Sequence, residues 1–159
     1  MTSVRTHLWF GNDKAVEAAH FYAEHIPRLH RHPRGHRPHL PPTTASPTSS
    51  SSSSPATPVI GLNAGPVFHL NEAFSFYLSV EGQEEVDHYW DLLTADGGEP
   101  GACGWCKDKY GVSWQLIPRE LEELSGDYST EANFRVAQAM LKMGKIDVAE
   151  IQAAYDGGA

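Results

Sequence analysis

The sequence predicts an α+β fold in which two βαβββ modules form a curved mixed sheet, followed by a C-terminal helical extension. Three observations predict it. Strands of alternating apolar and polar residues begin near Val4 and again near Phe74, and each is followed by apolar residues at helical spacing. A further helical pattern follows Pro118. Two such modules side by side would give the sheet a concave face, and the first module is expected to be incomplete.

Residues 1–27 begin the first module. Val4, Thr6, Leu8 and Phe10 alternate with Arg5, His7 and Trp9, which predicts a half-buried strand. After the Gly11-Asn12-Asp13 turn, the apolar residues Val16, Ala19, Tyr22 and Ile26 predict a helix. Pro27 ends it, because proline disfavours a helical residue before it.

Residues 28–58 differ from the rest of the chain. The segment is first rich in His, Arg and Pro and then in Ser, Thr and Pro, with consecutive serines from Ser49 to Ser54. Such sequence buries too little apolar surface to offset its ordering entropy, so we expect disorder. A reading-frame excursion is the second hypothesis, since a shifted strand sequence yields serine runs. Alternating strand sequence in another frame of the gene would support it, and its absence from both would refute it.

Residues 59–117 complete the first module and contain the second. Val59–Asn63 predicts a short strand, and Phe74, Phe76, Leu78 and Val80 alternate with polar residues in another. A helix follows Gly82, with apolar positions Val86, Tyr89, Trp90 and Leu93, and ends at Gly97-Gly98. A strand pair, 103–107 and 112–117, closes the module around a turn.

Residues 118–159 predict a helical extension. Phe134, Ala137, Met140 and Leu141 form an apolar stripe expected to pack on the sheet or on a second subunit. Gly144 is a candidate C-cap. Asp147 and Glu150 resemble a capping box for a last helix.

Composition restricts the classes of function. The 159 residues carry a net charge of −8, which disfavours nucleic-acid binding because such binding needs a positive surface. No apolar run approaches the length of about 18 residues that a membrane span requires. The first residues lack the apolar region of a signal peptide, so we expect a cytoplasmic protein without membrane partners.

Cys103 and Cys106 form a Cys-x-x-Cys pair. A redox pair would open a helix after a strand, whereas this pair leads into a turn between strands. A zinc site would need a second ligand pair. We therefore interpret both as reduced thiols, and the sequence assigns them no role.

Several strings resemble the PhnB-like family, also called 3-demethylubiquinone-9 3-methyltransferase-like, of the glyoxalase/bleomycin-resistance/dioxygenase (vicinal oxygen chelate) superfamily. They are Leu62 to Phe68, Asn71 to Phe76, Gln83 to Trp90, Cys103 to Trp105, Lys107 to Gln115 and Ala139 to Met143. The resemblance covers residues 4–27 and 58–157 and implies paired βαβββ modules in a homodimer. It breaks in 28–58, where family members carry the second and third strands of the first module.

The resemblance also bears on chemistry. Methyl transfer of the Rossmann type is rejected, because no glycine-rich strand-to-helix turn is present. The superfamily often binds a divalent metal through one residue from the first and last strand of each module. Those positions fall on Arg5, Ser75, Gln115 and Leu62 or Asn63, of which only Gln115 is a credible ligand. A two-residue shift would add His7. We expect no complete metal site and no cofactor.

Alternation places a polar and aromatic set on the concave face, which is typical of a small-molecule pocket. Its members are Arg5, His7, Trp9, Ser75, Tyr77, Ser113 and Gln115. The leading hypothesis is a homodimeric domain that binds a small molecule, whose identity the sequence does not specify. The alternatives are a divalent-metal lyase, isomerase or dioxygenase using Gln115 and His7, and a non-catalytic protein that sequesters a drug or toxin. Equally, these side chains could simply face solvent or a second subunit.

Overall fold

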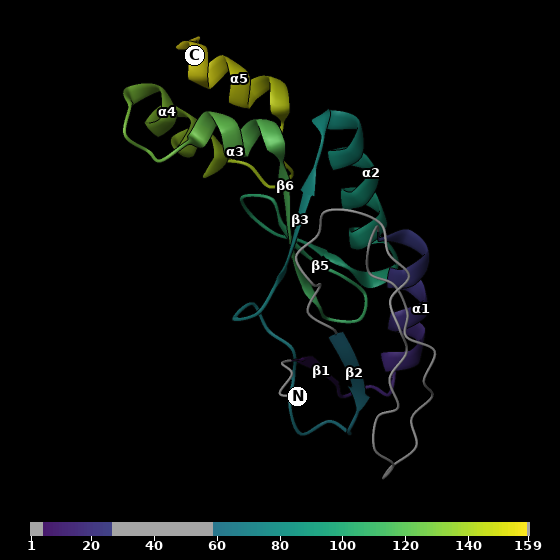
Figure 1. Cartoon of the computed structure of the whole chain (residues 1–159). Helices are drawn as coiled ribbons and strands as arrows, with labels where there is room; N and C mark the ends of the chain where they lie inside the picture. Colours follow the sequence, from purple (N-terminus) through teal and green to yellow (C-terminus); the bar gives the residue numbers. More distant parts are fainter. Residues whose placement is uncertain (1–4, 27–58, 159) are drawn as a thin grey trace, which may run out of the picture. The chain divides into compact units, whose positions relative to one another are not determined.

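The computed structural model describes residues 5–26 and 59–158, which belong to two compact units, Met1–Phe68 and His69–Ala159 (Figure 1). The first contains a two-stranded sheet and the second a four-stranded sheet. This mixed composition of helices and sheets confirms the α+β class. The predicted low-complexity segment 28–58 lies outside the described residues.

In the first unit, strand β1 (Thr6–Phe10) runs parallel to β2 (Val59–Asn63) and is followed by helix α1 (Ala15–His25). Leu8 and Phe10 are buried, as their alternation predicted. The helix is also confirmed. Its buried face consists of Ala15, Ala18 and Tyr22, whereas Val16 is 54% exposed. The Ala15 amide donates to the Asn63 side-chain oxygen at 2.8 Å, so β2 supplies the cap of α1.

The second unit begins with a full βαβββ module. It comprises β3 (Phe76–Val80), α2 (Gly82–Thr94), the short 3₁₀ turn η1 (Ala95–Gly97), β4 (Glu99–Pro100), β5 (Trp105–Lys107) and β6 (Ser113–Pro118). The strand order is β3-β6-β5-β4, with β3 parallel to β6 and the other pairs antiparallel. The predicted module is confirmed. The sequence did not predict β4, because two residues including a proline show no alternation.

One face of this sheet is apolar and lies under α2, which contacts β5 and β6. Val86, Trp90 and Leu93 are the buried residues of α2. The buried strand residues on this apolar face are Val80, Cys106, Trp114 and Leu116. Because successive strand residues point to opposite faces, the residues between these point away from α2.

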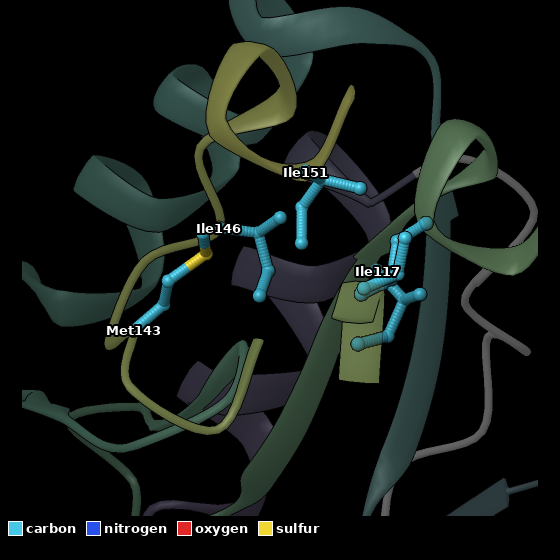
Figure 2. Packing of buried hydrophobic residues seen from close by; sticks show 6 residues of the cluster. Ile117, Met143, Ile146 and Ile151 are labelled. Atoms are coloured by element: carbon cyan, nitrogen blue, oxygen red, sulfur yellow. The ribbon is translucent and has the colours of Figure 1, made fainter. Parts of the chain in front are cut away.

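The C-terminal extension consists of α3 (Arg119–Ser125), α4 (Glu131–Met140) and α5 (Val148–Asp156). Its core joins the last strand to all three helices, and Figure 2 shows four of the six residues by name. They are Ile117, Leu121, Val136, Met143, Ile146 and Ile151. The extension therefore packs on the β6 end of the sheet, which was one of the two packing surfaces expected for it.

Two details of the extension differ from expectation. Phe134 and Leu141 are 59% and 58% exposed, and Val136 faces the core instead. Gly144 does not cap α4, which ends at Met140. The Gly144 carbonyl instead accepts a hydrogen bond from the Gly104 amide. Of the capping box expected at Asp147 and Glu150, the structure gives the N-cap bond, in which the Asp147 carboxylate accepts from the Glu150 amide at 2.9 Å.

Across residues 5–26 and 59–158, no helix combines the length and the apolar character that crossing a membrane requires.

Candidate functional site

The face of the four-stranded sheet that points away from α2 carries most of the polar strand residues. We call it the polar face. Strand register places Tyr77 opposite Gln115, Gln115 opposite Trp105, and Ser113 opposite Lys107. Glu99 lies opposite Lys107 at the sheet edge. The polar face thus comprises Tyr77, Ser79, Glu99, Trp105, Lys107, Ser113 and Gln115, with Ser75 just before β3.

Four predicted site residues lie in this unit, and two of them interact directly. The Gln115 side-chain amide donates to the Ser75 hydroxyl at 2.8 Å, which links β6 to the residue just before β3. Tyr77 donates its hydroxyl to Glu122 of α3 at 2.5 Å, and Ser79 donates to the other oxygen of the same carboxylate at 3.3 Å. Partial burial, and then the Glu122 carboxylate, raise the pKa of Tyr77. Tyr77 is therefore a neutral hydrogen-bonding phenol at neutral pH.

Ser113 is the fourth of these residues, and it is buried. Among the described side chains, its hydroxyl oxygen is the fully enclosed polar atom without a hydrogen-bond partner. A buried hydroxyl without a partner costs roughly 1–3 kcal/mol, so such an atom calls for an explanation. A bound molecule that hydrogen-bonds it would recover that energy.

A shallow cavity of about 140 Å³ lies at this end of the polar face. Ser113 lines it together with Trp105 and Lys107 of β5, Glu99 of β4, and Glu72 of the loop before β3. Lys107 forms an ion pair with Glu72 at 2.5 Å. The hydrogen bond between them is the main cause that lowers the pKa of Glu72 and raises the pKa of Lys107.

The other three predicted residues lie in the first unit, His7 and Trp9 on β1 and Arg5 just before it. Arg5 and His7 are exposed, and Trp9 is half-buried. The Trp9 indole donates to the Gly65 carbonyl at 2.8 Å and meets the Phe68 ring edge-on at 4.9 Å. These contacts give Trp9 a structural role in holding the 64–68 turn against β1.

The two cysteines are free thiols in different surroundings. Cys106 is buried in β5 on the face under α2, and this burial raises the pKa of its thiol to about 12. Cys103 is half-buried in the turn before β5. A redox pair requires a lowered thiol pKa, and the environment of Cys106 does the opposite.

Metal ligands need to converge on one point. Within residues 5–26 and 59–158, no three His, Cys, Asp or Glu side chains do so. In the second module, the first-strand and last-strand positions hold Ser75 and Gln115, whose side chains bond to each other. A serine hydroxyl is a poor donor for a transition metal, so Gln115 is the one credible ligand of the two. The pair therefore does not fit its half of such a site.

Sequence reasoning missed several residues of this region, namely Glu72, Ser79, Glu99, Trp105, Lys107 and Glu122. Strand alternation could have identified Lys107, because it lies two residues after Trp105 on β5 and therefore on the same face. Glu72 lies in a loop and Glu122 in a helix outside the strands, so strand periodicity carries no signal for either. Their roles depend on contacts across 35 and 45 positions of sequence, to Lys107 and Tyr77.

Comparison with known proteins gave matches to a family and to solved structures. The model of the family described as 3-demethylubiquinone-9 3-methyltransferase matches residues 2–117. A comparison with curated proteins found no match. A putative 3-demethylubiquinone-9 3-methyltransferase, PhnB protein, from Bacillus cereus is 24% identical over 74% of this chain and 99% of its own, with a TM-score of 0.47. Protein PA1353 from Pseudomonas aeruginosa is 18% identical over 74% and 98%, with a TM-score of 0.46.

Proposed function

We propose that this chain, which belongs to the 3-demethylubiquinone-9 3-methyltransferase family, binds a small molecule on the polar face without a resident metal. The observation that carries the proposal is the cavity on that face, whose lining includes Ser113. The buried hydroxyl of this residue has no hydrogen-bond partner among the described residues. A ligand with complementary hydrogen-bonding groups would be stabilised in such a cavity by bonding to polar groups of its lining.

Hydrogen bonds elsewhere on the polar face support the same proposal. Gln115 and Ser75 hold each other, and Glu122 holds Tyr77. Polar side chains fixed in this way are preorganised, so less entropy is lost when a ligand binds. The helical extension covers the Ile117 end of the face, and the Glu72 loop flanks the other.

The proposal assigns binding and not methyl transfer. Helix α1 follows the turn Gly11 to Lys14, and α2 follows Glu81 with Gly82 as its first residue. Neither connection is the glycine-rich turn that holds a nucleotide-like cofactor in Rossmann-type enzymes. We derive no step through a metal, because Ser75 and Gln115 are a poor donor pair.

A ligand screen on the full chain tests the proposal. Thermal melts are recorded with a library of small cationic, anionic and neutral compounds, in wild type and in Gln115→Leu. A ligand at 100 times its Kd adds about 2.7 kcal/mol of stability. We expect at least one compound to raise the Tm of wild type and to have a weaker effect on Gln115→Leu. Glu131→Gln, an exposed change on α4, is the matched control.

Elemental analysis of the tag-free protein distinguishes the alternatives. Near one equivalent of Ni, Zn, Mn or Fe per chain, with a Tm that a chelator lowers, would contradict the metal-free proposal and favour a metal-dependent lyase, isomerase or dioxygenase. Binding without metal and without turnover of the hit compound would support a sequestering role. A library without any stabilising compound would refute the proposed function.

A further inference from the structure

The cavity beside Ser113 has an unequal balance of charge. Among the side chains that line it, Glu72 and Glu99 are acidic and Lys107 is basic. Lys107 is already paired with Glu72 through a contact of 2.5 Å. Glu99, opposite Lys107 in the β4-β5 register, is left as the second carboxylate at this site. The cavity therefore has a net charge of −1 when all three groups are ionised.

An aromatic side chain adds to this preference. Trp105 of β5 lines the same cavity and is half-buried. The face of an indole ring attracts cations, and tryptophan does so more strongly than the other aromatic residues. A carboxylate and an indole together are suited to hold a cationic nitrogen.

Ser113 provides a second, independent observation at this cavity. It is 2% exposed, lines the cavity, and has no hydrogen-bond partner within the described part of the chain. A serine hydroxyl both donates and accepts, so it suits a hydroxyl or amino group on the ligand. The volume of about 140 Å³ accommodates a group of only a few heavy atoms.

We propose that this cavity receives a small organic ammonium group, held by the Glu99 carboxylate and the Trp105 ring, while Ser113 hydrogen-bonds a neighbouring polar atom of the ligand. The inference rests on the proposed function and specifies the chemical class of its ligand. The opposite assignment is an anion that displaces Glu72 from Lys107. It is disfavoured because it would bring a third negative charge beside Glu72 and Glu99.

Three probes of nearly equal size test the proposal by charge. Ethanolammonium, ethylene glycol and glycolate share a hydroxyl and differ in being cationic, neutral and anionic. Each is titrated into the ¹⁵N-labelled full chain at constant ionic strength, because salt screens charges near a surface. The Trp105 indole signal, assigned with Trp105→Phe, and the Ser113 amide signal report binding at the cavity.

We expect ethanolammonium to bind several-fold more tightly than ethylene glycol, and glycolate to be the weakest. Glu99→Gln and Trp105→Leu should each weaken ethanolammonium about threefold to tenfold. Glu123→Gln, which removes an exposed carboxylate of α3 outside the cavity, should leave its Kd unchanged. Ser113→Ala should weaken binding without lowering the Tm of the free protein, because the hydroxyl has no hydrogen-bond partner among residues 5–26 and 59–158.

Other results overturn the proposal. Tighter binding of glycolate would make Lys107 an anion site, and equal binding of all three probes would show that charge is not recognised. A lower Tm for free Ser113→Ala would give the hydroxyl a structural role. If ethanolammonium fails while another compound from the library stabilises wild type through Gln115, the ammonium assignment falls and the proposed function stands. If neither binds, both fall.

Discussion

Asp108 determines the conformation of the turn between β5 and β6. Its side chain is 3% exposed and accepts hydrogen bonds from two backbone amides and one indole. One oxygen accepts from the amides of Tyr110 and Val112 at 2.9 and 3.0 Å, and the other accepts from the Trp114 indole at 2.8 Å. The carboxylate thus links the turn to the largest fully buried side chain of the sheet. The sequence predicted the turn but no role for Asp108, because these hydrogen bonds depend on how the two strands pair.

Asp108→Asn tests this interpretation at constant side-chain size. An amide has one accepting oxygen, so its NH₂ group would face either the Trp114 indole N–H or the two backbone N–H groups. Leaving a buried donor without an acceptor costs roughly 1–3 kcal/mol, and we expect a loss of this size in urea unfolding. Asp91→Asn on the exposed surface of α2 should change stability by less than about 0.5 kcal/mol. Equal effects of the two changes would contradict the role of Asp108.

At the scale of elements, the helical extension is joined to the sheet through the backbone of one turn. The amides of Cys103 and Gly104 donate to the carbonyls of Met143 and Gly144, both at 2.8 Å. Gly104 has a φ of +80°, and a Cβ there would lie 2.8 Å from the Leu116 carbonyl oxygen. It would also lie 3.2 Å from Ile146 in the core of the extension. Only glycine lets the turn, β6 and the extension approach this closely.

We therefore expect Gly104→Ala to destabilise the protein more than the same substitution at a glycine that has a similar positive φ but no crowding around its Cβ position. Gly111→Ala provides the control, because Gly111 has a φ of +85° and open space at the Cβ position. Strain alone should cost about 1–2 kcal/mol at Gly111. Crowding should bring the total at Gly104 to about 2–5 kcal/mol. Chemical denaturation of both variants checks this, and equal losses would show that the contacts of Gly104 with Leu116 and Ile146 cost nothing.

Periodicity predicted the type of most elements, and it failed where two faces carry apolar residues. In α4, Phe134 and Leu141 fit a helical stripe as well as Val136 does, yet only Val136 is buried. The choice depends on which face meets Ile146 and Ile151 of the later segments, which no local pattern encodes. In the same way, strand alternation predicted Ser75, Tyr77, Ser113 and Gln115 on one face. It gave no indication that Glu122 and Glu72 would reach the same region.

At the scale of the whole molecule, the described parts of the two units differ in the size of their sheets. The second has a four-stranded sheet, a helix on one face and the Ile117 core under its extension. The described part of the first has two paired strands and one helix. A two-stranded sheet is at best marginally stable by itself, whereas three or more strands packed on a helix can be stable alone. We infer that the second unit accounts for most of the cooperative stability of the chain.

This inference predicts that a fragment of residues 69–159 folds without the first unit. We expect a cooperative thermal transition by circular dichroism and dispersed amide signals, with a fragment of residues 1–68 showing neither. Ile151→Ala probes the same core in both contexts, because Ile151 is 0% exposed. Truncating a buried isoleucine costs roughly 2–5 kcal/mol, and the loss should be equal in the fragment and in the full chain. A fragment that melts without cooperativity, or an Ile151→Ala effect that appears only in the full chain, would show that the second unit depends on the first for its stability.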